Sequence, residues 1–91
     1  MSLRFKYAAL ADLADIQQYI GERNPAAAAR MAQEIIVACE KLELFPERGR
    51  RGTEPGTREL TTVWPYVIVY RHEQGDVEIL RIWHGRRSWR R

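Results

Sequence analysis

The sequence predicts an α+β domain with the element order β-α-α-β-β-β, in which a helical hairpin packs on a small antiparallel sheet. Three observations predict it: an alternating segment at the N-terminus, two consecutive segments with helical apolar spacing, and three strand-like segments in the second half. The chain has 91 residues, which is the size of one small domain. We therefore expect a single domain over residues 1–91.

The N-terminal half begins with a strand followed by a helix. Residues Leu3–Tyr7 alternate apolar and charged side chains, which predicts a short half-buried strand. From Ala8 onward, apolar residues recur every three or four positions, which predicts an amphipathic helix that ends near Gly21–Arg23. The acidic pair Asp12/Asp15 lies away from the apolar stripe, so we expect both carboxylates to be solvated.

A second helix follows after a very short turn. Asn24 is a suitable N-cap, and Pro25 occupies the first helical position, where its missing N–H costs nothing. The apolar residues step by three and four as far as Pro46, which ends the helix. They are Ala28, Met31, Ile35, Ala38, Leu42 and Phe45. Two helices joined by so short a turn form an antiparallel hairpin.

The second half contains a loop and three strands. Residues Pro46–Gly56 are rich in Gly, Pro and Arg, which predicts an exposed basic loop. The segments Arg58–Val63, Tyr66–His72 and Val77–His84 have strand character, and Glu73–Asp76 supplies a hairpin turn between the last two. These three strands complete the predicted sheet.

Both faces of the last two strands carry apolar residues. In the last strand, alternation places Arg81 on the face of Val77 and Ile79, with Ile82 and His84 on the opposite face. We expect the helices to cover one face of the sheet and a further segment, such as that of a partner, to cover the other.

The net charge of +3 is unevenly distributed along the chain. Residues 1–45 contain five basic and six acidic side chains, whereas residues 46–91 contain ten and six. Thirteen of the fifteen basic residues are arginine, whose planar guanidinium pairs with carboxylate or phosphate through two hydrogen bonds. The second half therefore favours an anionic partner.

Several classes of protein lack support in the sequence. The single Cys39 excludes an internal disulfide, and two His with one Cys do not compose a closed structural zinc site without carboxylate ligands. Nucleotide-loop, dinucleotide-binding, zincin and serine-hydrolase motifs do not occur. No apolar run approaches the length of a membrane span. We expect a cytoplasmic protein with no metal, no cofactor and no membrane association.

The candidate functional residues gather toward the C-terminus. They are Arg58, Arg71, Arg81, His84, Arg86, Arg87 and Trp89. A basic stretch that contains an indole combines phosphate pairing with stacking on bases, or supplies a hot spot for a protein partner. Structural alternatives remain open: arginines paired across strands with Glu59, Glu73 or Glu78, a strand-end histidine, and a solubilising tail.

The same residue types suit metal-free cleavage of RNA. Such a reaction needs a base near the 2′-hydroxyl, an acid for the leaving oxygen and cations for the developing charge. His84 is the candidate acid or base, and Arg58 and Arg81 are the candidate phosphate ligands. A further alternative is a binding module for nucleic acid or protein, in which the arginines supply affinity alone.

Four segments, in this order, resemble a known family. They are Leu44–Arg50 (LFPERGR), Gly56–Leu60 (GTREL), Pro65–Arg71 (PYVIVYR) and Val77–Arg87 (VEILRIWHGRR). With them the chain resembles the RelE/ParE superfamily of bacterial toxins, and most closely its ParE-like plasmid stabilisation branch. The resemblance implies a compact α+β toxin that a cognate antitoxin neutralises by wrapping it, and that inhibits growth when released.

The two branches of this superfamily imply different targets. The RelE-like ribonuclease branch places an arginine directly after the aromatic residue that opens the third strand, where this sequence has Val67. The ParE branch poisons DNA gyrase through surfaces that include the basic C-terminal region. The resemblance therefore favours binding of gyrase over ribosome-dependent cleavage of mRNA. We expect the antitoxin to cover the helical hairpin and the sheet with an acidic or amphipathic segment.

Overall fold

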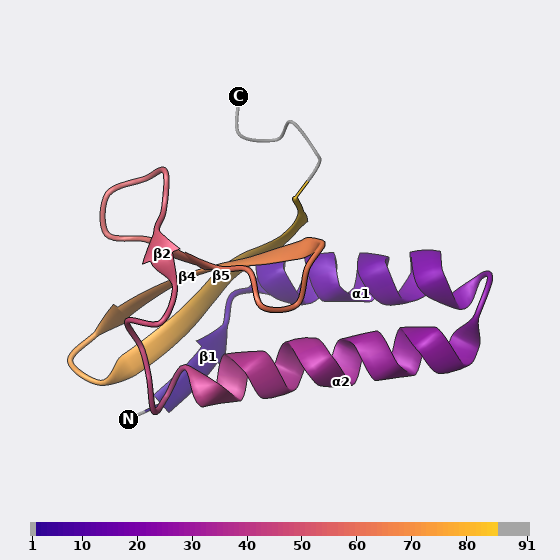
Figure 1. The fold of residues 1–91 in the computed structure, drawn as a ribbon, viewed down its shortest axis with the longest axis horizontal. Coiled ribbons are helices and arrows are strands. Elements are labelled where there is room, and N and C mark those ends of the chain that lie inside the picture. Colours follow the sequence, from indigo (N-terminus) through magenta and orange to yellow (C-terminus); the bar gives the residue numbers. More distant parts are fainter. Residues whose placement is uncertain (1, 86–91) are drawn as a thin grey trace.

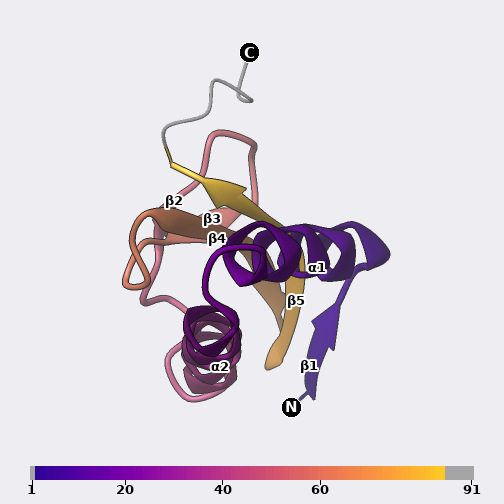
Figure 2. The ribbon, with the colours of Figure 1, turned by 90° about the vertical axis from the view of Figure 1, so that its right-hand side faces the viewer.

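The computed structural model describes residues 2–85, and it confirms the α+β class and the predicted order of helices and strands. Its elements are β1 (Ser2–Phe5), α1 (Tyr7–Gly21), α2 (Pro25–Lys41), β2 (Arg50–Arg51), β3 (Arg58–Leu60), β4 (Tyr66–Glu73) and β5 (Asp76–His84). The strands form one sheet in the order β1-β5-β4-β3-β2, and α1 and α2 lie side by side against it (Figures 1 and 2).

The sequence predicted an antiparallel sheet, but the sheet is mixed. β1 runs parallel to β5, with Ser2 opposite Asp76 and Phe5 opposite Ile79, while the other pairings are antiparallel. Since almost the whole chain separates β1 from β5, no local turn fixes their relative direction, and the sequence pattern carries no signal for it.

Three predicted elements end earlier than expected, and one short strand was not predicted. β1 ends at Phe5, so Tyr7 opens α1 and is 91% exposed. α2 ends at Lys41, because the chain turns away there and leaves Phe45 61% exposed instead of in the core. Within the predicted loop, Arg50–Arg51 form the short strand β2, whose two residues are too few for a periodic pattern. β3 stops at Leu60, where the turn into β4 begins.

The core lies between the helical hairpin and the sheet. Ile35 and Leu42 from the helical side meet Ile68, Tyr70 and Ile79 from the sheet, all fully buried. The predicted N-cap is confirmed, because the Asn24 side chain accepts a hydrogen bond from the N–H of Ala27 at 3.0 Å. Within residues 2–85, no helix combines the length and the apolar character needed to cross a membrane.

The segment between α2 and β2 is held by a buried tyrosine. The Tyr70 hydroxyl donates to the carbonyl of Pro46 at 2.6 Å and accepts from the N–H of Gly49 at 2.9 Å. Arg58 Nη1 donates to the carbonyl of Gly49 at 2.7 Å. A side chain at Gly49 would place its Cβ only 2.8 Å from the Glu59 carbonyl oxygen, so the position requires glycine. These contacts fix where β2 joins the sheet.

Cys39 sets an alkaline limit to stability. Burial, and to a lesser extent the charge of Glu40, raise the pKa of its thiol from 9.0 to about 12. The unfolded chain therefore loses this proton near pH 9 while the folded chain retains it, and the free energy of unfolding falls as the pH rises through this window. The slope is about 1.4 kcal/mol per pH unit for this one proton.

Urea unfolding between about pH 8 and pH 11 measures this loss. The Cys39→Ala variant should lose much less stability over the same range. A smaller slope remains above about pH 10, because burial also raises the pKa of Tyr70. Identical slopes for the two proteins would show that the thiol does not limit stability.

Candidate functional site

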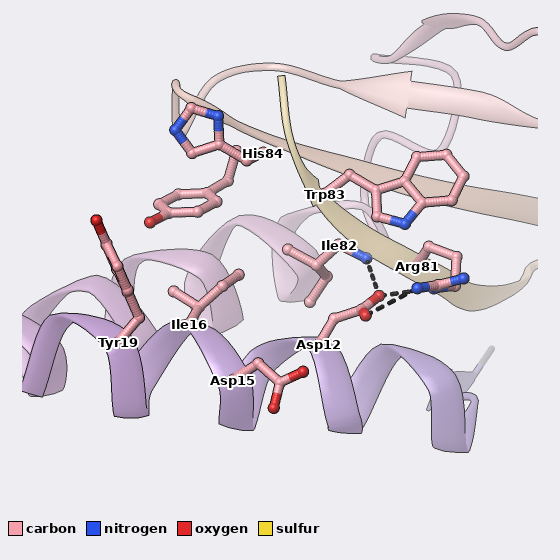
Figure 3. A pocket seen from close by; sticks show the side chains of 9 residues that line it. Asp12, Asp15, Ile16, Tyr19, Arg81, Ile82, Trp83 and His84 are labelled. Atoms are coloured by element: carbon pink, nitrogen blue, oxygen red, sulfur yellow. Dashed lines mark hydrogen bonds and ion pairs between the residues drawn. The ribbon is translucent and has the colours of Figure 1, made fainter. Parts of the chain in front are cut away.

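A groove opens between α1 and the C-terminal half of β5 (Figure 3). β1 pairs only with the first part of β5, as far as Ile79, and beyond that point α1 lies beside the strand. The groove has a volume of about 570 Å³. It is lined by Asp12, Asp15, Ile16, Tyr19, Tyr66, Arg81, Ile82, Trp83 and His84. We call it the α1–β5 groove.

Asp12 connects the two walls of the groove. Its carboxylate accepts hydrogen bonds from Arg81 Nε at 2.7 Å and Arg81 Nη2 at 3.0 Å, and also from the backbone N–H of Ile82 at 2.9 Å (Figure 3). These contacts raise the pKa of Arg81 and keep its guanidinium charged. Only 14% of the Asp12 side chain is exposed, so the prediction of a solvated carboxylate at this position is wrong.

A bulge in β5 turns Ile82 into the core. The register pairs Val69 with Arg81 and Tyr70 with Ile79, which leaves Leu80 as the extra residue. The alternation therefore shifts, and Ile82 joins Val77 and Ile79 in the buried cluster, not the opposite face as predicted. His84, two residues further, lies on the groove side of the strand.

Aromatic rings form the far end of the groove. Tyr66 and His84 are opposite each other in the β4–β5 register, and their rings meet edge to face with centroids 5.6 Å apart. Tyr19 is 61% exposed and rises from α1 toward this pair (Figure 3). The Arg81 guanidinium lies 5.1 Å from the centre of the Trp83 ring, a cation–π contact in addition to its ion pair.

The structure brings together only part of the predicted site. Arg81 and His84 both line the groove, whereas Arg58 lies on β3, opposite Tyr70. Tyr70 is about 13 Å along β4 from the residue that faces His84, so Arg58 is remote from the groove. Arg71 is exposed and stands opposite Glu78. Arg86, Arg87 and Trp89 fall outside the described residues.

Sequence reasoning missed most of the α1 wall. Asp12, Ile16 and Tyr19 have spacings of four and three, so a helical projection places them on one face. That spacing indicated a shared helical face, but it did not indicate a site, because the partners of Asp12 lie on a strand at the other end of the chain. The predicted partners of Arg81 were glutamates on neighbouring strands, and its actual partner is this aspartate.

The chemistry that the groove offers is limited by the Asp12–Arg81 ion pair. The guanidinium is already bound to a carboxylate through two nitrogen atoms, so it presents little net charge to a phosphate. In the part of the chain that the structure describes, no three His, Cys, Asp or Glu side chains are placed to hold a metal ion. The groove therefore presents polar and aromatic side chains around a neutralised ion pair.

Comparisons with known proteins agree in sequence and in fold. A family model described as the ParE toxin of the type II toxin-antitoxin system parDE matches residues 3–89. Toxin RelE2 of Caulobacter vibrioides is 49% identical over 79 residues, which cover 87% of this chain and 89% of that protein. Toxin RelE1 of the same organism is 40% identical over 70 residues, 74% of each chain.

A solved structure gives the same result at the level of the fold. A chain from a structure described as the chromosomal ParDE TA system from P. aeruginosa is similar with a TM-score of 0.80. The two chains are 31% identical, and the similarity covers 90% of this chain and 92% of the other.

Proposed function

The chain belongs to the ParE toxin family of type II toxin–antitoxin systems, and we propose that it inhibits growth in the cytoplasm by binding and poisoning DNA gyrase. Membership of this family implies a cognate antitoxin as its partner. The proposed action requires a binding surface and no covalent chemistry by the toxin itself.

The observation that supports binding over RNA cleavage is that both candidate phosphate ligands, Arg58 and Arg81, are bound to other groups of the protein. A metal-free ribonuclease needs its acid, base and cations around one phosphate. Arg81 is bound to Asp12, and Arg58 donates to the backbone carbonyl of Gly49 away from His84. Of the two candidate phosphate ligands, Arg81 therefore shares the groove with His84 but is already paired with a carboxylate, and Arg58 lies away from both.

A RelE-like ribonuclease remains the second candidate function. His84 lies in the groove against Tyr66, so an imidazole and a phenol are available together for proton transfer. The two Caulobacter relatives also carry the RelE name, whereas the solved structure is a ParDE system. The two functions differ in whether RNA is cut and whether His84 is needed for it.

The proposed antitoxin contact is the α1–β5 groove together with the exposed apolar side chains of the helical hairpin. Tyr7, Leu10 and Tyr19 on α1 and Ile36 on α2 are at least 36% exposed. An amphipathic segment would bury these side chains, while its acidic residues would pair with exposed arginines of the hairpin, Arg23 and Arg30.

Induced expression in a bacterial host tests the toxin function. We expect growth to stop when the chain is expressed alone and to continue when the product of the adjacent reading frame is expressed with it. The antitoxin should also copurify with the toxin. Normal growth in a host that lacks any antitoxin would contradict the proposal, provided that full-length protein accumulates.

A further inference from the structure

A second hollow lies at the opposite edge of the sheet from β1. It is formed by the loop between β2 and β3 together with Arg51, Arg58 and His72, and its volume is about 490 Å³. The loop projects from the sheet, away from α1 and α2 (Figures 1 and 2). The hollow is therefore separate from the α1–β5 groove and from the surface proposed for the antitoxin.

The pairing of β2 with β3 leaves positive charge at this hollow. Arg50 stands opposite Glu59 and forms an ion pair with it at 2.9 Å, so its charge is neutralised. Arg51 stands opposite Arg58, and like charges in directly opposed positions destabilise a strand pair. Within residues 2–85, neither Arg51 nor Arg58 belongs to an ion pair. A bound anion would relieve this repulsion.

One of the two guanidinium groups is held in place before any ligand arrives. Arg58 Nη1 donates to the carbonyls of Gly49 at 2.7 Å and Glu47 at 3.3 Å. The other guanidinium nitrogens of this half-buried side chain form no hydrogen bond with the described residues. Arginine presents its nitrogens in a planar fork that matches phosphate oxygens, so the fixed Arg58 beside the exposed Arg51 suits a phosphate group.

The lining also indicates which nucleic acid fits. Among the residues that the structure describes, it contains the imidazole of His72 but no Phe, Tyr or Trp ring. Proteins that bind single-stranded RNA or DNA stack its bases on aromatic side chains, whereas contacts to a duplex are made largely to phosphates. An open hollow whose lining, over residues 2–85, has arginines and no aromatic platform suits the backbone of a duplex.

We propose that Arg51, Arg58 and His72 form a phosphate site that binds the backbone of double-stranded DNA. Glu54 is the one acidic side chain among the described residues that line the hollow, and it weakens this binding. The site extends the proposed function but does not depend on it, because it requires only the toxin and DNA. If the toxin does not poison gyrase, the proposed phosphate site is unaffected. If the toxin does not bind duplex DNA, gyrase is still a candidate target.

Fluorescence anisotropy with a labelled duplex of about 20 base pairs tests the site in the full-length chain, at several salt concentrations. Arg51→Gln should weaken binding about three- to tenfold and reduce the slope of log affinity against log salt by about 1. Glu54→Gln should strengthen binding. Arg58 is left unchanged because its hydrogen bonds also hold the segment before β2.

The matched controls are Arg30→Gln and Glu34→Gln, which make the same charge changes at exposed positions on α2. We expect both to bind DNA like the unsubstituted protein. If Arg30→Gln weakens binding as much as Arg51→Gln, the affinity comes from net charge and the site does not exist. If the protein binds a single-stranded RNA of equal length more tightly than the duplex, and Arg51→Gln loses that binding, the assignment to duplex DNA is wrong.

Discussion

Replacing Asp12 with alanine is expected to lower the free energy of unfolding by about 2–4 kcal/mol. The substitution removes two hydrogen bonds to Arg81 and one to the N–H of Ile82. The Arg81 side chain is 42% exposed, so in the variant water can replace part of the hydrogen bonding that Asp12 provided. The N–H of Ile82 has no replacement acceptor from a neighbouring strand, because β1 ends beside Ile79, and it accounts for much of the cost.

Thermal unfolding followed by circular dichroism measures this effect. The melting temperature should fall by about 10–20 °C for a chain of this size. Asp15→Ala is the matched control, because it removes a carboxylate from the next turn of α1, where the side chain is exposed and has no ion pair within residues 2–85. If the two variants melt within about 2 °C of each other, Asp12 does not join α1 to β5 as described.

Tyr70→Phe is expected to lower the free energy of unfolding by about 2–3 kcal/mol. The ring still fills its place in the core, but the carbonyl of Pro46 and the buried N–H of Gly49 both lose their partner. Because this hydroxyl fixes the segment that leads into β2, the loss of stability should be largest at the edge of the sheet formed by β2.

Hydrogen exchange shows whether the loss of stability in Tyr70→Phe is concentrated at the edge of the sheet formed by β2. In Tyr70→Phe the amide of Gly52, which bonds to the carbonyl of Thr57, should exchange faster relative to the amides of β4 than in the unsubstituted chain. Tyr7→Phe makes the same chemical change at a 91% exposed position and should change neither stability nor exchange. Uniformly faster exchange in Tyr70→Phe would mean that the hydroxyl stabilises the whole fold and not this edge.

The parts of the fold that local patterns encode were predictable from the sequence. The helical hairpin follows from apolar spacing and from the Asn24-Pro25 start signal, and the β4–β5 hairpin follows from Gly75 between two strand-like runs. Gly75 indeed adopts a positive φ of 87° in that turn. Each of these features depends on residues that are close together in the chain.

The site was less predictable because it depends on long-range register. The bulge at Leu80 leaves no mark in a segment whose faces are both apolar, yet it decides which side chains of β5 meet α1. The Asp12–Arg81 pair joins residues 69 positions apart, so neither residue reveals the other. Arg58 was predicted from its charge, but its hydrogen bonds to the loop carbonyls depend on a strand pairing that only the fold supplies.

The proposed mode of action is tested most directly by offering the purified toxin both targets. The chain and its His84→Ala variant are incubated with gyrase and supercoiled DNA and, separately, with translating ribosomes. We predict gyrase-dependent DNA cleavage complexes and intact mRNA with the unsubstituted chain. Cleavage of mRNA at the ribosome that disappears in His84→Ala, with no trapped gyrase–DNA complex, would contradict the proposal and identify the protein as a ribonuclease.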